Sequence, residues 1–289
     1  MAVSVARIPH RAGLSLGRLI TAPGWERRVG LIGVLAVALL AIFAPLVIHY
    51  DPNAIDVTSA LQAPSSAHLF GTDAYGRDVL TRVLYAARID LQIGLIGMII
   101  PLVSGTIIGL FAGFYGGLID AVTGRVIDVV VAFPFLVIVI AIVAVLGPGL
   151  INFYIAVSLV SWVAYARIIR GEVLSARGRE YLLAARTLGY SNWRIMFRHL
   201  LPNVVPAVFV FAMSDIVLDI LAGASLGFFG LGVQPPTAEW GVMIADGRNF
   251  ITTAWWVVTF PGLAIIVVGL FFSLIGDGLA DAVRRIDAE

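Results

Sequence analysis

Two aspartates lie within one long apolar stretch in the second half of the chain. Asp215 and Asp219 are four residues apart, so a helix would place both carboxyl groups on one face. An ionised carboxylate at the centre of a bilayer costs at least about 2.5 kcal/mol on insertion scales, so we expect both groups to face protein or water. They either pair with an arginine or a hydroxyl group on a neighbouring helix, or face a path for a charged ligand.

The composition excludes several other kinds of chemistry. The chain has no cysteine, which rules out disulfides, thiolate nucleophiles and sulfur-ligated metals. Its histidines, His10, His49, His68 and His199, fall on different segments, so no metal site is expected. All 19 basic residues are arginine, and a P-loop needs a lysine to reach the terminal phosphates of a nucleotide. We therefore expect no catalytic residues, no cofactor and no metal in this chain.

The two aspartates must be positioned by a chain that is mostly apolar. Of its 289 residues, 60% are apolar and 13% are charged, which leaves too little polar surface for a soluble globule. Stretches of about 20 apolar residues are long enough to cross a bilayer as helices. They predict an all-α membrane protein with six transmembrane helices, at approximately 29–48, 91–115, 126–146, 151–169, 204–228 and 254–275.

The arginines are unevenly distributed around these spans. Fifteen of the 19 fall on one face: five in 1–28, seven in 167–198, two in the tail, and Arg125. The positive-inside bias makes that face cytoplasmic, and an even number of spans places both termini there. The expected order is a cytoplasmic segment at 1–28, a first transmembrane helix at 29–49, an extracytoplasmic segment at 50–90, a transmembrane core at 91–276 with a cytoplasmic loop at 170–203, and a cytoplasmic tail at 277–289.

The loop at 170–203 is unusually polar for a connection between two spans. Residues 179–188 are rich in helix formers, and Gly189 follows them as a typical C-terminal stop. Ser191 or Asn192 can then cap a second helix that runs toward Pro202. The pattern predicts two short helices joined by a sharp turn, outside the membrane.

This loop resembles the coupling loop of permease subunits of ATP-binding-cassette (ABC) importers. The family motif is Glu-Ala-Ala, three residues, Gly, nine residues, Ile, any residue, Leu-Pro. The chain matches it except at Leu183, in place of the glutamate, and at His199, in place of the isoleucine. The resemblance implies that the loop docks in a cleft of a separate ATPase subunit and conveys its movement to the spans. The ATPase-coupling residues that it implies are Glu180, Ala184, Ala185, Gly189, Arg194, Leu201 and Pro202.

Two segments on the other face resemble the peptide, opine and nickel importer group of this family. Residues 68–91 resemble the stretch before the permease core, and 223–248 resemble the loop after the fifth span. In the first segment, Val79 and Val83 recur at helical spacing opposite charged residues, which predicts an amphipathic helix at the membrane interface. In the second, Trp240 is expected either to anchor the loop at that interface or to contact a binding protein.

Together, the three segments imply a type I ABC importer permease fold and identify the chain as a C-type permease subunit in the bacterial inner membrane. Such a subunit forms half of the translocation pathway for dipeptides or oligopeptides, where Asp215 and Asp219 would meet the ammonium end of a peptide. Opine and metal-chelate importers share these motifs. The implied partners are a homologous second permease, two ATPase subunits or domains that bind ATP and magnesium, an extracytoplasmic substrate-binding protein and membrane lipid, with no nucleic acid.

Two other classes of function are compatible with an apolar helical chain. A self-contained secondary transporter or channel for small solutes would need no ATPase, but such proteins often contain inverted repeats, and no similarity between the two halves is evident. An intramembrane enzyme would need a nucleophile with a base, or a metal motif. Asp215 and Asp219 could form an acid pair, yet they lack the flanking motif of a membrane protease.

Overall fold

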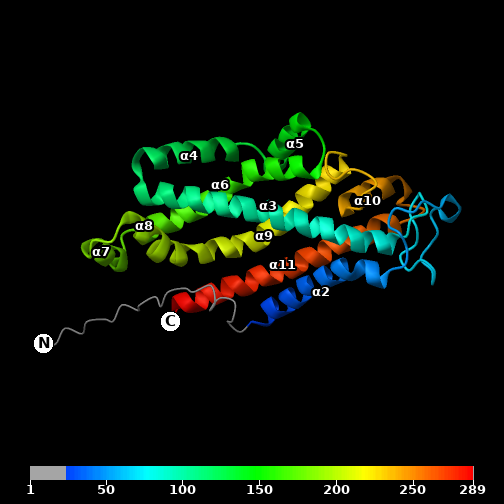
Figure 1. Cartoon of the computed structure of the whole chain (residues 1–289), viewed down its shortest axis with the longest axis horizontal. Coiled ribbons are helices and arrows are strands. Elements are labelled where there is room, and N and C mark those ends of the chain that lie inside the picture. The colour runs from blue at the N-terminus through cyan, green and yellow to red at the C-terminus, as the bar shows by residue number, and fades with distance from the viewer. Residues whose placement is uncertain (1–23, 289) are drawn as a thin grey trace.

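The computed structural model of the chain describes residues 24–288, and all its named elements are helical (Figure 1). The prediction of an all-α membrane protein is confirmed. Five helical stretches are long and apolar enough to cross a membrane, and a bent pair makes a sixth span if it counts as one. The long helices are α2 (Trp25–Val47), α3 (Val79–Tyr115), α6 (Leu150–Ala176), α9 (Leu201–Phe228) and α11 (Trp256–Ala288). The shorter ones are α4 (Gly117–Val131), α5 (Phe135–Leu146), α7 (Glu180–Thr187), α8 (Asn192–Arg194) and α10 (Trp240–Gly247).

The bundle has two distinct ends. The start of α2, the end of α11 and the whole of α7 lie at one end, which we call the α7 end (Figure 1). The connection between α2 and α3 lies with α10 at the opposite end, the α10 end. The predicted N-terminal segment at 1–28 lies, up to residue 23, outside the described residues. The predicted tail at 277–289 is not a separate segment, because α11 continues through it to Ala288.

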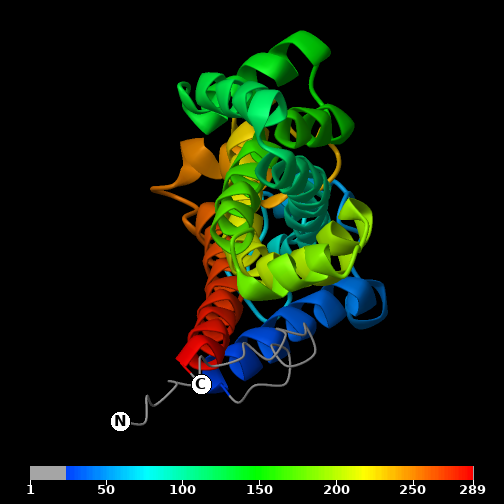
Figure 2. The same cartoon turned by 90° about the vertical axis from the view of Figure 1, so that its left-hand side faces the viewer.

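The third predicted span, at 126–146, is not one straight helix. It comprises the second half of α4 and the whole of α5, whose axes meet at 87°. Pro134 lies at the break with an extended backbone, and its ring provides no N–H for a helix that continues from α4. Hydropathy registers the apolar composition of this stretch but not its change of direction. Figures 1 and 2 both place α4 and α5 on the side of the bundle opposite α2.

The amphipathic helix expected at the membrane interface is instead the first part of α3. The helix begins at Val79, after the cap of Asp78, and continues without interruption to Tyr115. Both faces of its first turns are buried, including Val79 and the guanidinium-bearing side chain of Arg82. The predicted helix is present from Val79, but it is continuous with the second span rather than separate, and its charged face contacts protein.

Small residues let α3 approach α6 closely. Gly105 and Gly109 of α3 face the backbone of α6, where a side chain on either would meet the carbonyl oxygens of Trp162 and Ala166. In lipid, such packing rather than expulsion of water holds helices together. The α3–α6 contact is the most extensive between helices of the described part of the chain, and the buried side chains that surround it form the centre of the bundle.

Helix α2 is fastened to α3 by a guanidinium group. Pro45 lies inside α2 and has no N–H to donate to the carbonyl of Ala41 one turn earlier. The Nε atom of Arg88, in α3, donates to that oxygen at 2.5 Å, and its Nη2 atom donates to the carbonyl of Ile42 at 2.7 Å. Arg88 thus satisfies the backbone group that Pro45 leaves without a partner in its own helix.

Replacement of Arg88 by leucine is expected to lower the free energy of unfolding by about 1–3 kcal/mol, because a backbone carbonyl inside the membrane loses its donor. The same replacement in a Pro45→Ala background should cost less, because an alanine in place of the proline restores the N–H that bonds to the carbonyl of Ala41. Denaturant unfolding of the four proteins in detergent measures both costs. An equal cost in the two backgrounds would contradict this account of the Arg88 contact.

Candidate functional site

The turn after α7 has the local geometry that the sequence predicts. Gly189 has a φ of +76°, a left-handed conformation that favours glycine, and its N–H donates to the carbonyl of Arg186 at 2.9 Å. The N–H of Tyr190 donates to the carbonyl of Ala185 at 3.1 Å. Ser191 then caps the next helical segment, since its Oγ atom accepts from the N–H of Arg194 at 3.3 Å. The predicted stop and cap are confirmed.

The second helix of this region is not short, which corrects the predicted pair of short helices. Residues 192–228 form one helical run, in which α8 leads through a π-helical turn (Ile195–Leu200) into α9. Pro202 lies in the first turn of α9 rather than at the end of a helix. The side-chain amide of Asn203 donates to the carbonyl of His199 at 2.5 Å beside this proline. The turn is therefore joined to the fifth span by an unbroken helical run.

The two alanines of the coupling motif differ in their surroundings. Ala185 is buried together with Leu182, and both belong to the same apolar core as Ile195 and Met196 of the π-helical turn. These contacts fix α7 to the beginning of the fifth span. Ala184, on the other side of α7, is exposed. Ala184 is thus available to a partner, whereas Ala185 holds α7 in place.

Apolar side chains are exposed around Ala184 at the α7 end. Leu183 is 48% exposed, Leu188 is 69% exposed and Trp193, just after the turn, is 64% exposed. We call Leu183, Ala184, Leu188 and Trp193 the coupling surface. If this end lies in water, a surface of this kind marks a contact with another protein.

Aromatic rings pack against one another beside and within the coupling surface, a feature that was not predicted from the sequence. The ring of Tyr190 stacks on His199 with 5.5 Å between centroids, and the guanidinium group of Arg194 lies 4.1 Å from the Tyr190 centroid. Trp193 and Phe197 have centroids 4.2 Å apart. Trp193 and Phe197 are four residues apart, and this helical spacing was the available signal, whereas Tyr190 lies just before the helix cap. The other predicted coupling residues are Glu180, which begins α7, and the adjacent Leu201 and Pro202, which begin α9.

Asp215 and Asp219 lie on the buried side of α9, as their spacing predicts. Asp215 accepts a hydrogen bond from the hydroxyl of Tyr165, in α6, at 2.6 Å. Asp219 is fully buried, and neither of its carboxyl oxygens has a hydrogen-bond partner among the described residues. A side chain added at Gly97 of α3 would lie 2.6 Å from Asp219 Oδ2. The two acids therefore lie between α3, α6 and α9, away from lipid.

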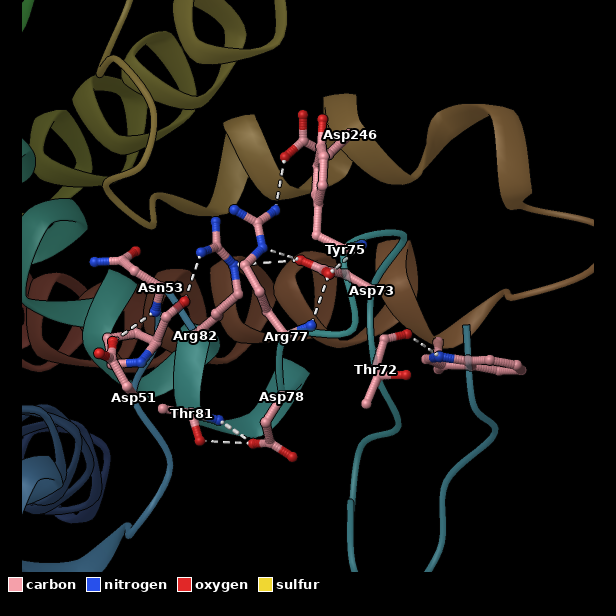
Figure 3. Close-up of polar contacts among 12 residues, drawn as sticks. Asp51, Asn53, Thr72, Asp73, Tyr75, Arg77, Asp78, Thr81, Arg82 and Asp246 are labelled. Carbon is pink, nitrogen blue, oxygen red and sulfur yellow. Dashed lines mark hydrogen bonds and ion pairs between the residues drawn. The ribbon is translucent and has the colours of Figure 1, made fainter. Parts of the chain in front are cut away.

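The α10 end contains a network of charged groups (Figure 3). Arg77 lies between two acids: its Nε atom is 2.6 Å from Asp73 Oδ2, and its Nη2 atom is 3.4 Å from Asp246 Oδ2 in α10. Arg82 donates from Nη1 to the carbonyl of Pro52 at 2.8 Å, and its Nε atom lies 3.7 Å from the same carboxylate of Asp73. This network joins the segment before α3 to α10.

Trp240 is not an anchor at a membrane interface, which corrects the sequence-based expectation. Its side chain is 1% exposed, and its indole Nε1 donates to the carbonyl of Val83 at 3.1 Å. Trp240 is the first residue of α10 and fastens that helix to α3. Its hydrogen-bond partner lies 157 residues away in the sequence, so no local pattern could indicate the contact.

Within residues 24–288, no group of three or more histidine, aspartate or glutamate side chains is placed to hold a metal ion. The site thus consists of the coupling surface at the α7 end, the aspartates in the membrane interior and the charged network at the α10 end. Of these three, the coupling surface is the one that offers an exposed apolar contact to another protein.

Comparisons with known proteins give a consistent result. A family model described as the binding-protein-dependent transport system inner membrane component matches residues 105–285, and a second, described as the N-terminal transmembrane domain of oligopeptide transport permease C, matches residues 28–64. The chain is 45% identical to the dipeptide transport system permease protein DppC of Alkalihalophilus pseudofirmus, over 88% of this chain and 84% of the relative. It is 42% identical to the probable D,D-dipeptide transport system permease protein DdpC of Escherichia coli, over 86% and 83%. It is also 41% identical to the nickel transport system permease protein NikC of Escherichia coli, over 89% and 93%.

Proposed function

Because this chain belongs to the family of binding-protein-dependent transport system inner membrane components, we propose that it forms half of the translocation pathway of an ABC importer for dipeptides or oligopeptides. It is a permease subunit, a multi-pass protein of the bacterial inner membrane, and not itself an enzyme. The observation that supports a peptide cargo is the identity of 42–45% to relatives named as dipeptide permeases, over more than four fifths of both chains.

We further propose the partners of this subunit. The coupling surface docks on one of two ATPase subunits, which bind ATP and magnesium, so the α7 end is cytoplasmic. A second, homologous permease completes the pathway, and an extracytoplasmic substrate-binding protein delivers the cargo to the α10 end. The absence of lysine supports the assignment of ATP hydrolysis to another chain, since a P-loop requires one.

Reconstitution of the complete importer in liposomes tests this function. With ATP inside and the binding protein outside, labelled dipeptides should accumulate, while a nickel chelate should not compete for uptake. Uptake of nickel rather than peptide would refute the peptide cargo and leave the importer assignment intact. Transport by the purified chain alone, without an ATPase subunit, would instead support a secondary transporter or channel.

We also propose that Asp215 and Asp219 line the pathway and meet the ammonium end of the peptide. Their burial between three helices and the lack of a partner for Asp219 among the described residues support this role, because a carboxylate inside a membrane protein is stabilised by a cation or by water. The hydrogen bond from Tyr165 to Asp215 is compatible with a purely structural role for Asp215. The two roles make different predictions.

Replacement of Asp215 by asparagine is expected to reduce the apparent affinity for peptides with a free ammonium group by about tenfold or more, since a hydrogen bond to a charged group contributes about 1.5–3 kcal/mol. The affinity for N-acetylated peptides should not change. The introduced asparagine can still accept from the Tyr165 hydroxyl, so a structural role alone predicts no effect on either substrate. Competition uptake assays distinguish these outcomes, with Asp128→Asn on the exposed side of α4 as the control.

A further inference from the structure

Two carboxyl groups hold the N-terminus of α10. Asp90 Oδ2, from α3, accepts from the N–H of Trp240 at 3.2 Å. The two oxygens of Glu239 accept from the N–H groups of Gly241 at 2.7 Å and Val242 at 2.9 Å. All three N–H groups at the start of α10 are thus satisfied by side-chain oxygens.

These two carboxyl groups are also neighbours. Asp90 and Glu239 are both 0% exposed and accept from the N–H groups of the consecutive residues 240–242, so both carboxyl groups lie at the same buried helix start. The Oδ1 atom of Asp90, which is not used by Trp240, has no donor among the other described groups. Because an ionised carboxyl group can only accept hydrogen bonds, a hydrogen bond between two carboxyl groups requires that one of them retains its proton. The geometry therefore calls for one proton in this pair.

No base neutralises the pair within the described part of the chain. On α6, the hydroxyl of Tyr154 is buried without a partner among the described residues and lies within electrostatic reach of Asp90. On α9, the glycine at 227 lies against the carboxyl group of Glu239, and the nearest acid along that helix is Asp219, eight residues earlier in the sequence. Helix α11 has no titratable side chain before Asp277.

The arginines at this end are engaged elsewhere. Arg82, two turns before Asp90 on α3, donates to the carbonyl of Pro52 and lies near Asp73. Arg77 bonds to Asp73 and to Asp246, the acid of α10 itself, and Arg248 lies over the ring of Phe228. Two ionised carboxylates in contact, both without a cation, would repel each other in a region of low dielectric constant.

We propose that Asp90 and Glu239 form a proton-binding site, in which one shared proton joins the two carboxyl groups and fastens α10 to α3. This inference concerns the chain itself and does not depend on the identity of the cargo. Burial raises the pKa of the Glu239 carboxyl above its ordinary value. Loss of the proton leaves two adjacent buried charges and weakens the attachment of α10.

The direction of the pH dependence follows from this pKa. A carboxyl group whose pKa is raised by folding binds more protons in the folded than in the unfolded protein. Its contribution to stability is complete below its ordinary pKa and is lost as the pH rises through the raised value. The wild-type protein should therefore lose stability between mildly acidic and alkaline pH.

The variant Asp90→Asn tests the proposal, because the asparagine can accept from Trp240 and donate to Glu239 without a proton from solvent. We expect the thermal midpoint of the wild-type protein in detergent to fall by several degrees as the pH rises, and that of Asp90→Asn to remain constant over the same range. Asp51→Asn, an exposed acid at the same end, is the control and should retain the wild-type profile. A wild-type profile in Asp90→Asn would overturn the proposal.

Infrared spectroscopy provides a second readout that a merely structural role would not change. The spectrum of the wild-type protein minus that of Asp90→Asn at neutral pH should contain the carbonyl stretch of a protonated carboxylic acid. If Asp90→Asn does not fold, Glu239→Gln serves in its place, because the glutamine can donate to Asp90 while its oxygen still accepts from the start of α10. A difference spectrum without the protonated carboxyl band would refute the shared proton.

Discussion

Replacement of Gly109 by alanine is expected to lower the stability and the yield of the folded protein markedly, although it adds only one methyl group. That group would lie 2.5 Å from the carbonyl oxygen of Ala166 and 3.0 Å from its Cα atom, both in the backbone of α6. Backbone atoms can move only if α3 and α6 separate along their whole contact. Overpacking of this kind costs about 1–3 kcal/mol or more, against a total stability of about 5–15 kcal/mol.

The yield of monodisperse protein and its thermal midpoint in mild detergent measure this effect. Gly171→Ala is the matched control, because Gly171 lies in α6 and a side chain there meets nothing within 4 Å. The control should be stabilised slightly, since alanine favours a helix over glycine by about 1 kcal/mol. If both variants behave alike, the close approach of α3 and α6 does not limit stability.

Replacement of Ala184 by tryptophan is expected to abolish ATP-driven uptake while the subunit still folds and inserts. Ala184 is an exposed member of the coupling surface, so an indole there changes the surface that a partner contacts without disturbing the chain's own core. The loss of a central contact at an interface costs at least about 2 kcal/mol, or roughly a 30-fold weaker association with the ATPase subunit. Uptake into liposomes and co-purification of the ATPase subunit measure the two effects.

Two comparisons make this prediction specific. Ala185→Trp should reduce the yield of the subunit itself, because Ala185 is 4% exposed and packs in the core under α7. Ala63→Trp, at an exposed position before α3, should change neither folding nor transport. Full association of the ATPase subunit with the Ala184→Trp protein would exclude the coupling surface as its docking site.

Features that depend on neighbouring residues could be predicted from the sequence. The turn at Gly189 and the cap at Ser191 were correct because each is determined within a few residues of the chain. The spans were located because their length and composition are local properties. The bend between α4 and α5 was missed, since composition does not report direction, although Pro134 was a usable signal.

Features that depend on distant contacts could not be predicted. The charged residues around the start of α3 were expected to face water, but Arg77, just before the helix, is paired with an acid 169 residues later. Trp240 was expected at an interface, yet its indole bonds to α3. The contact between Asp90 and Glu239 joins two acids that, in the sequence alone, show no sign of meeting. In each case the tertiary fold changes the environment from water or lipid to protein.

The bond from Arg88 to the carbonyl of Ala41 also has a consequence for the order of biosynthesis. The two residues are 47 positions apart, so at about 5–20 residues per second Ala41 is made roughly 2–9 s before the arginine that it needs. During that interval the carbonyl of Ala41 has no hydrogen-bond donor, because Pro45 lacks an N–H. An unsatisfied backbone carbonyl is costly in lipid. The first span therefore gains its missing donor only after the beginning of the second span has been translated, and we expect the insertion machinery to integrate the two spans together.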